Sequence, residues 1–328
     1  MIKFNSSKII KRILFIIPSK VHLLDIIGPA HIFYEAKEYG TDIELHFVTI
    51  NNDTQVNSSA GLHFTKLEPF HKFQLSEDDF VFIPGIEFSL ISNNQFYLTN
   101  KLFFKWIKDQ YSNGAQICSV CTGTFLVASS GILNGKSCTT HWKYFSEFNE
   151  KHPEIELIKN RLFVVEDRLY SSAGVTSGID LALYILETEF GSKLAADVAK
   201  EVVIYFRRSQ SDPQLSIFLQ YRNHLDTRIH DAQDYMIKHI DSSFVLEDIA
   251  ESVHMSPRNL TRLFKKTTGI TIGAYLEKLR LDRAIHLLAE GNKVSYVSNQ
   301  CGLKSSNQLR NLLKKHGEVL PTQIKSLL

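Results

Sequence analysis

The last hundred residues of this 328-residue chain contain one helical pattern twice, and this repeat restricts the fold more than any other feature. In the first copy, apolar residues recur at helical spacing on both sides of Ser256-Pro257. Ser256 can cap the second helix of the pair, and Pro257 suits its first turn. Because the apolar positions would lock two helices together across a short turn, the segment predicts a helix-turn-helix unit. These positions are Leu246, Ile249, Ala250, Val253, Leu260, Leu263 and Phe264.

A second copy follows about fifty residues later. Between the copies, Thr271 to Glu290 predicts one long helix that ends at Gly291 and would hold both units at a fixed separation. Two recognition helices on one rigid frame can enter successive major grooves about 34 Å apart on one face of DNA. From Asp226 onward strand signals disappear, so the tail is predicted to be all-α. The second copy is built on Val294, Val297, Cys301, Gly302, Leu303, Leu309, Leu312 and Leu313.

Polar and basic side chains occupy the open faces of both second helices. Residues 256–325 contain 13 Lys and Arg against 4 Asp and Glu, whereas residues before 228 carry a net charge of −3. Such clustering is expected of a nucleic-acid-binding face. One copy alone could be any pair of packed amphipathic helices with a solvated basic surface, but two copies favour DNA binding. The open faces carry Arg258, Asn259, Thr261, Arg262, Lys265 and Lys266, and then Ser306, Asn307, Arg310, Asn311, Lys314 and Lys315.

Residues 228–328 resemble the AraC family of transcription regulators, because both units, the long helix and the closing Pro321 fall in family order. The chain departs from the family at Ile272, where a proline is usual, at Leu303, where an aromatic residue is usual, and at Gly317, which is out of place. These departures concern local geometry more than function, since apolar character and segment lengths are kept. The resemblance implies base-reading roles for Arg258, Thr261, Arg262, Ser306, Asn307, Arg310 and Asn311. It implies phosphate contacts, which position a protein without specifying sequence, for Lys265, Lys266, Lys314 and Lys315.

The first two hundred residues alternate short β-branched runs with helical patterns, which predicts βαβ units and a parallel sheet. The predicted strands are Lys11 to Ile17, Ile43 to Ile50, Phe80 to Ile83, Ala115 to Val120, Arg161 to Glu166 and Leu169 to Ser172. The predicted helices are Ile26 to Tyr39, a helix after Gly123 that runs through Ser130, one from His141 to Phe148, and Thr176 to Phe190.

A polar stretch from Arg207 to Asp212, followed by a proline, predicts a linker. We therefore expect an N-terminal domain at 1–207, a linker at 208–225 and a DNA-binding domain at 226–328. The apolar run Ile13 to Ile17 is too short for a membrane span or a signal peptide. Four cysteines in so long a chain provide no disulfide framework. These features predict a cytoplasmic, nucleoid-associated protein without a membrane partner.

Cys121 lies in a tight turn between a predicted strand and a predicted helix, which is the arrangement of a nucleophile elbow. A helix N-terminus is expected to favour its thiolate form. Residues 11 to about 206 resemble the PfpI-type branch of the class I glutamine amidotransferase-like superfamily, through the motifs at 24–29, 119–123, 139–142 and 172–180. The resemblance implies a flavodoxin-like three-layer sandwich, commonly dimeric, with a small pocket at the elbow.

The candidate pocket residues are Asp25, Gly85, Cys121, Thr122 and His141. In related isonitrile hydratases the positions matching Asp25 and Cys121 act together in catalysis. A Cys-His protease would need a histidine where Thr122 stands, and Ile86, in place of a second glycine, is expected to crowd the pocket. We favour a ligand-contacting or redox-sensing role for Cys121 over a catalytic one, and a structural role for His141.

No metal or cofactor is expected. The spacing of Cys118 and Cys121 is that of a C-x-x-C motif, but alternation along a strand and the lack of a second pair argue against zinc.

The leading hypothesis is a regulator whose N-terminal domain forms a homodimer and senses a small-molecule effector while its tail binds a promoter site in double-stranded DNA. Activation and repression both remain open. The alternative is a cysteine-dependent hydratase or amidohydrolase that its tail tethers to DNA. A third hypothesis, a DNA-packaging protein, predicts no base preference.

Overall fold

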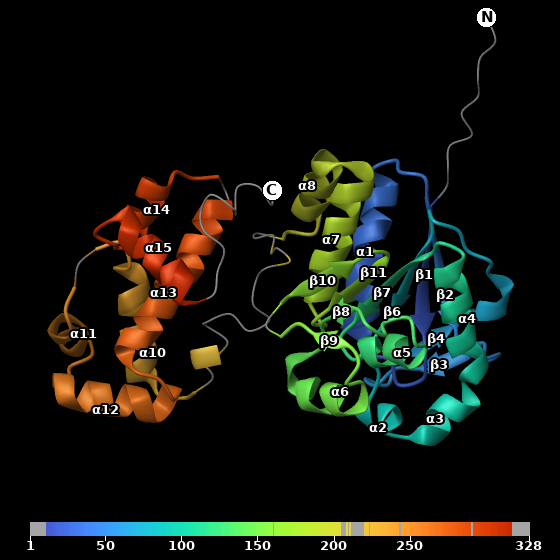
Figure 1. The fold of residues 1–328 in the computed structure, drawn as a ribbon, viewed down its shortest axis with the longest axis horizontal. Helices are drawn as coiled ribbons and strands as arrows, with labels where there is room; N and C mark the ends of the chain where they lie inside the picture. The colour runs from blue at the N-terminus through green and yellow to red at the C-terminus, as the bar shows by residue number, and fades with distance from the viewer. Residues whose placement is uncertain are drawn as a thin grey trace, which may run out of the picture. The chain divides into compact units, whose positions relative to one another are not determined.

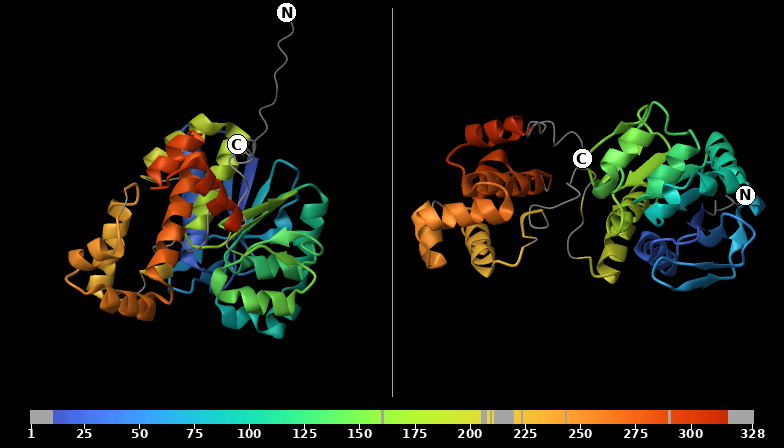
Figure 2. Two further views of the ribbon diagram at one scale, coloured as in Figure 1. Left: turned by 60° about the vertical axis from the view of Figure 1, so that its left-hand side comes forward. Right: turned by 90° about the horizontal axis from the view of Figure 1, so that it is seen from below.

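The chain divides into two compact units, Met1–Gln214 and Leu215–Leu328. Figures 1 and 2 show the computed structural model. Most of the linker predicted at 208–225 lies outside the described residues. Among the described residues, no helix combines the length and the apolar character that a membrane span requires. The structure describes residues 11–159, 161–204, 208, 210, 220–222, 224–242, 244–289 and 291–316.

A seven-stranded sheet forms the centre of the first unit, in the order β10-β11-β7-β6-β1-β2-β5. Its neighbouring strands are parallel except for the antiparallel pair β10–β11. The strands are β1 (Lys11–Ile17), β2 (Ile43–Thr49), β5 (Glu68–Pro69), β6 (Phe80–Ile83), β7 (Gln116–Val120), β10 (Phe163–Glu166) and β11 (Leu169–Ser172). Two small ribbons lie outside this sheet, formed by β3 (Gln55–Asn57) with β4 (His63–Thr65) and by β8 (Ser137–Cys138) with β9 (Glu156–Leu157).

Hydrophobic cores cover both faces of this sheet. Along β1, Phe15 and Ile17 belong to one core, whereas Leu14 and Ile16 belong to the other. This alternation follows from the period of two in a strand. It explains why β1 is a continuous apolar run, as expected for a parallel strand buried on both faces.

Helices pack on these two cores and complete the three-layer sandwich. Helices α1, α7 and α8 supply the first core, and α4, α5 and α6 contribute to the second (Figure 1). The predicted flavodoxin-like α/β fold is thereby confirmed. The helices of this unit are α1 (Leu23–Glu38), α2 (Phe88–Ile91), α3 (Asn94–Thr99), α4 (Lys101–Ser112), α5 (Gly123–Ser129), α6 (Phe145–Lys151), α7 (Ser177–Phe190) and α8 (Ser192–Glu201), with 3-10 turns η1 (Phe70–Lys72) and η2 (Trp142–Tyr144).

The described elements of the second unit are helices, which confirms the predicted all-α tail. They are α10 (Thr227–Lys238), α11 (Leu246–Ser252), α12 (Pro257–Thr268), α13 (Ile272–Ala289), α14 (Val294–Gln300) and α15 (Ser306–Lys315). Ser256 caps α12 by accepting a hydrogen bond from the backbone N–H of Asn259 at 3.4 Å, and Pro257 occupies the first turn as predicted. Thr271 Oγ1 accepts from the backbone N–H of Ala274 at 3.2 Å, so α13 has a cap although the family proline is missing. Gly317 and Pro321 lie outside the described residues.

Helix α13 joins the two helix-turn-helix units. Its first half contributes Tyr275 and Leu279 to the core of the first helix-turn-helix unit, and its second half contributes Ala284 and Leu288 to the core of the second helix-turn-helix unit. The turn at Gly302 adds a second connection: a Cβ at this position would lie 2.3 Å from the carbonyl oxygen of Ile240, which follows α10. The two helix-turn-helix units are therefore packed on one frame.

Candidate functional site

Cys121 follows β7 in a strained backbone conformation, with φ of 60°. Its N–H donates to the carbonyl of Ser172 at 3.0 Å, and its carbonyl accepts from Thr140 Oγ1 at 2.9 Å. The turn also depends on Gly123, because a Cβ there would lie 2.1 Å from the carbonyl oxygen of Ile83. A non-glycine residue held at positive φ by its surroundings is typical of an elbow that presents a functional side chain.

Asp25 lies in the first turn of α1 and is 1% exposed. Its Oδ2 accepts from the N–H of Gly85 at 3.0 Å, and its Oδ1 accepts from the N–H of Val175 at 2.8 Å. A carboxylate oxygen of Asp25 also lies within 4.8 Å of the thiol sulfur of Cys121. The structure thus brings together Asp25, Gly85 and Cys121, which are far apart in the sequence.

Burial governs the protonation of this pair. Burial raises the pKa of Cys121 well above its ordinary value, and the neighbouring Asp25 raises it further. The pKa of Asp25 is also raised by burial, although its hydrogen bonds to Val175 and Gly85 act in the opposite direction. Burial therefore opposes the thiolate form that the helix N-terminus was expected to favour, and the raised pKa keeps the thiol of Cys121 neutral near pH 7.

Thr122 and Ile86 line the other side of the turn. The backbone N–H of Ile86 and Thr122 Oγ1 lie 3.2 Å apart, and Thr122 Oγ1 also donates to the carbonyl of Ile86 at 3.2 Å. The side chain of Ile86 is fully buried and belongs to the core that contains Ile83. The Gly85 N–H, which a catalytic loop would aim at an oxyanion, is already bound to Asp25.

His141 lies at the start of η2, where its Nδ1 accepts from the N–H of Lys143 at 3.3 Å. Burial, Lys143 and His22 together lower its pKa. Within the described part of the chain it shares no hydrogen bond or ion pair with Asp25 or Cys121. These contacts fit the structural role that the sequence favoured.

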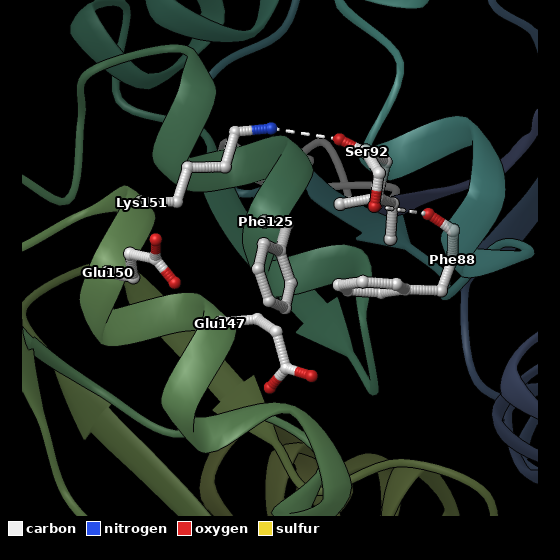
Figure 3. Close-up of a pocket in the computed structure, with 7 residues that line it drawn as sticks. Phe88, Ser92, Phe125, Glu147, Glu150 and Lys151 are labelled. Carbon is white, nitrogen blue, oxygen red and sulfur yellow. Dashed lines mark hydrogen bonds between the residues drawn. The ribbon is translucent and has the colours of Figure 1, made fainter.

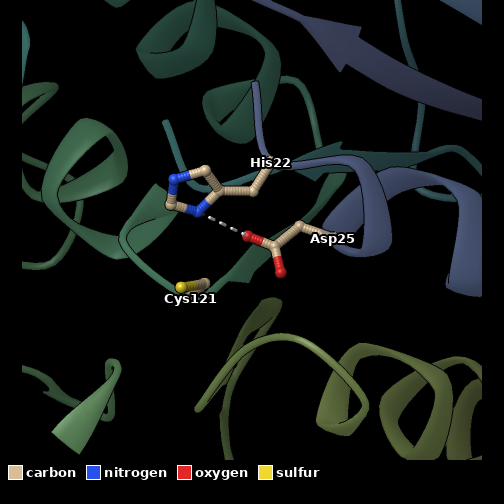
Figure 4. A group of neighbouring side chains, drawn as sticks. All are labelled: His22, Asp25 and Cys121. Carbon is tan, nitrogen blue, oxygen red and sulfur yellow. Dashed lines mark ion pairs between the residues drawn. The ribbon is translucent and has the colours of Figure 1, made fainter. Parts of the chain in front are cut away.

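His22 belongs to the site and was not predicted from the sequence. It is the N-cap residue of α1, and its Nδ1 lies 3.8 Å from Asp25 Oδ2. Ligand atoms of His22, Asp25 and Cys121 all lie within 4.8 Å of one another (Figure 4). The helix was predicted to begin at Ile26, whereas α1 begins at Leu23. A predicted start at Leu23 would have placed His22 next to Asp25.

Two cavities lie elsewhere in the first unit. One of about 360 Å³ is lined by Phe88, Phe125, Glu147 and Glu150, with Lys151 donating to the carbonyl of Ile91 at 2.9 Å (Figure 3). The other, of about 590 Å³, lies between α1, β2 and β4. Neither cavity is lined by Asp25 or Cys121.

The second unit presents the predicted DNA-reading faces to solvent. On α12, Leu260 and Phe264 are buried on one side, and the opposite side carries the predicted polar residues. On α15, Leu309 and Leu313 are buried in the same way. The exposed side chains are Arg258, Asn259, Thr261, Arg262, Lys265, Lys266, Asn307, Arg310, Asn311, Lys314 and Lys315, and Ser306 is half-buried.

The two recognition helices differ in how their polar side chains are engaged. On α15, Arg310 Nη1 donates to Asn307 Oδ1 at 3.0 Å. Lys315 Nζ lies 2.8 Å from Glu277 Oε1 on α13, so a residue predicted to contact phosphate is ion-paired. Arg262 on α12 has no hydrogen bond or ion pair among the described residues.

Comparisons with known proteins agree with this division. Residues 11–188 match the model of the DJ-1/PfpI family, and residues 249–326 match that of a helix-turn-helix domain. The HTH-type transcriptional regulator GbdR of Pseudomonas aeruginosa is 27% identical over 218 residues, which are 66% of this chain and 59% of the relative. CdhR of the same species, also an HTH-type transcriptional regulator, is 27% identical over 68% of this chain and 67% of the relative. The chain thus spans less than two thirds of the length of GbdR.

Three further similarities each cover about three fifths of this chain. An isonitrile hydratase of Pseudomonas putida is 27% identical over 61% of this chain and 79% of the relative. The crystal structure of an AraC family transcriptional regulator from Pseudomonas putida is 17% identical, with a TM-score of 0.51 over 58% of this chain and 99% of that one. Drosophila melanogaster DJ-1beta has a TM-score of 0.51 at 19% identity, over 60% of this chain and 100% of that one. These structures share the fold, and the chain belongs to the DJ-1/PfpI family with an AraC-type helix-turn-helix domain after it.

Proposed function

We propose that this protein is a sequence-specific, DNA-binding transcription regulator. The observation that carries the proposal is the frame of the second unit, in which α13 contributes to the cores of both helix-turn-helix units and leaves both recognition helices exposed. Such a frame allows both helices to engage one duplex. The relatives named as HTH-type transcriptional regulators support the same function.

The exposed residues divide by chemistry into base readers and phosphate contacts. Arginine and asparagine can form bidentate hydrogen bonds with base edges, which suits Arg262 on α12 and Asn311 on α15. The remaining proposed base readers are Arg258, Thr261, Ser306, Asn307 and Arg310. Lysine side chains suit phosphate, and we assign Lys265, Lys266, Lys314 and Lys315 to that role, the last in competition with Glu277.

For the first unit we propose sensing rather than catalysis. The thiol of Cys121 is neutral and almost fully buried, and the Gly85 N–H is occupied by Asp25, so neither an activated nucleophile nor a free oxyanion donor supports a reaction. We propose that this unit also forms the homodimer, that a small-molecule effector acts on it, and that the protein works in the cytoplasm on the nucleoid.

Selection of binding sites from random DNA at fixed salt tests the DNA-binding proposal. Replacing Arg262 by alanine should relax base preference in one half-site and cost about 1–3 kcal/mol of binding free energy. The Lys314→Ala variant should weaken binding equally on all sequences and lower the salt slope by about one. Lys238→Ala, which removes one exposed charge from α10, is the matched control and should change neither. Equal loss on all sequences for Arg262→Ala would contradict its assignment, and DNA binding without any selected site would indicate DNA packaging.

A second candidate function is a cysteine-dependent hydratase, as in the isonitrile hydratase relative. The proximity of the Asp25 carboxylate and the Cys121 thiol, within 4.8 Å, favours it. Incubation of the purified chain with an isonitrile separates the two functions. Product formation that is abolished in Cys121→Ala would establish catalysis, whereas saturable binding without turnover would support sensing.

A further inference from the structure

The site beneath the elbow combines an imidazole nitrogen, a carboxylate oxygen and a thiol sulfur, from His22, Asp25 and Cys121 (Figure 4). We propose that these three side chains bind one divalent transition-metal ion of the zinc type and leave its fourth coordination position open. The inference goes beyond the proposed function, because it requires neither DNA binding nor turnover.

The distances suit such an ion. The three ligand atoms lie within 4.8 Å of one another, and His22 Nδ1 lies 3.8 Å from Asp25 Oδ2. Zinc is bound by nitrogen and oxygen at about 2.0–2.2 Å and by sulfur at about 2.3 Å, so tetrahedral ligands lie roughly 3.5 Å apart. Binding of all three to one ion would therefore require the widest ligand separation to shrink by up to about 1.3 Å.

The backbone already holds the three ligands in place. The N–H of His22 donates to the carbonyl of Gly85 at 2.9 Å, and the N–H of Gly85 donates to Asp25. Gly174 packs against Cys121 so closely that a Cβ there would lie 2.8 Å from Sγ. Hydrogen bonds to a ligating carboxylate orient it for metal binding, and each Asp25 oxygen keeps lone-pair capacity for an ion.

Charge compensation gives a physical reason for a cation. Asp25 and Cys121 are two acids at 1% and 3% exposure whose ligand atoms lie within 4.8 Å of each other, and neither has an Arg or Lys partner among the described residues. A divalent ion would neutralise both conjugate bases at once. Binding forms a metal–sulfur bond as the thiol S–H breaks, and the proton leaves to solvent, as does any proton held by Asp25.

The donor set and the exposure indicate which metal binds and how it enters. Borderline-soft ions such as Zn²⁺ and Co²⁺ accept mixed nitrogen, sulfur and oxygen ligands, whereas Mg²⁺ and Ca²⁺ require oxygen. The side chain of His22 is 35% exposed and provides the open side. Three protein ligands with an open fourth position characterise zinc sites that bind a further ligand, not structural ones. Cys118 is fully buried in the core and takes no part.

Cobalt titration of the full-length chain tests this site. After removal of metals with a chelator, Co²⁺ should produce one thiolate-to-cobalt absorption band per chain, and Zn²⁺ should abolish it and release protons. In Cys121→Ser the band should vanish, and in His22→Gln the Co²⁺ affinity should fall at least tenfold. Cys138→Ser and His31→Gln are matched controls outside the cluster and should keep the wild-type band and affinity.

The proposal is overturned if the wild-type chain shows no saturable band, if Cys121→Ser keeps it, or if the control variants lose it equally. Circular dichroism of each variant excludes loss by unfolding, and His22→Gln changes a partly exposed side chain, which keeps the test informative if Cys121→Ser does not fold. Because no DNA is present, failure of the DNA-binding proposal would leave the outcome unchanged.

Discussion

Replacement of Gly302 by alanine should loosen the second helix-turn-helix unit from the first. Gly302 has φ of +62°, and an added Cβ would lie 2.3 Å from the carbonyl oxygen of Ile240 and 3.1 Å from Arg280 Nη2. The left-handed conformation costs alanine about 1 kcal/mol relative to glycine. Displacement of the Ile240 backbone adds about 1–3 kcal/mol, as in other overpacked sites. The expected total is about 2–4 kcal/mol.

Gly291 provides a matched control. It has φ of +81°, but no atom of the described residues lies within 4 Å of a Cβ built there, so alanine should cost only the backbone term of about 1 kcal/mol. Hydrogen exchange of the full-length chain, followed by mass spectrometry, reports the opening free energy of peptides from α14 and α15. Exchange there should be roughly 30- to 1000-fold faster in Gly302→Ala and about 5-fold faster in Gly291→Ala. Equally faster hydrogen exchange in the two variants would refute the contact between the two helix-turn-helix units.

Three further variants or treatments test the electrostatic conclusions. Burial acts to raise the pKa of Asp79, but hydrogen bonds from Arg12 and Ser76 lower it below its ordinary value. The ionised carboxylate therefore stabilises the fold above the unfolded pKa of about 3.9. This stabilisation is lost as the pH falls through the lower pKa of the folded state. Asp79→Asn should cost about 2–4 kcal/mol at pH 7, and less near pH 3, measured by tryptophan fluorescence during thermal unfolding. Iodoacetamide should alkylate Cys121 at least tenfold more slowly at pH 7 than it alkylates a free thiol, because burial raises its pKa; faster labelling in mass spectra would indicate a thiolate. Lys315 and His316 lower the pKa of the Glu277 carboxylate. Glu277→Gln should therefore free Lys315 to contact phosphate and steepen the salt dependence of DNA binding by up to about one released ion. An unchanged slope would exclude competition between Glu277 and phosphate for Lys315.

Local signals predicted the elements that depend on local chemistry. The strand Lys11–Ile17 has the predicted bounds, and α12 begins where Ser256 and Pro257 predicted. The strands Phe80–Ile83 and Leu169–Ser172 also have the predicted bounds, whereas the predictions for Ile43–Thr49, Gln116–Val120 and Phe163–Glu166 differ by one or two residues at one end. Helices α3, α4 and α8 were not predicted.

The site depends on contacts that no sequence spacing reveals. Asp25 is held by backbone N–H groups of Gly85 and Val175, which lie 60 and 150 residues away. The protonation of Cys121 depends on tertiary burial, which outweighs the helix dipole from which the thiolate was predicted. The direction of the Ile86 side chain likewise depends on core packing. Motifs can therefore identify the pocket residues, but not their charge or their partners.

The account depends most on both recognition helices engaging one duplex at a fixed separation. Insertion of five base pairs between the two half-sites of a selected DNA rotates one by about half a helical turn. Because α13 packs into both cores, the second helix-turn-helix unit cannot turn with the displaced half-site. The affinity of the wild-type chain for the DNA with the insertion should therefore fall to the affinity of Arg262→Ala for the original DNA, or below it. Unchanged affinity and unchanged protection of both half-sites in a footprint would contradict the account.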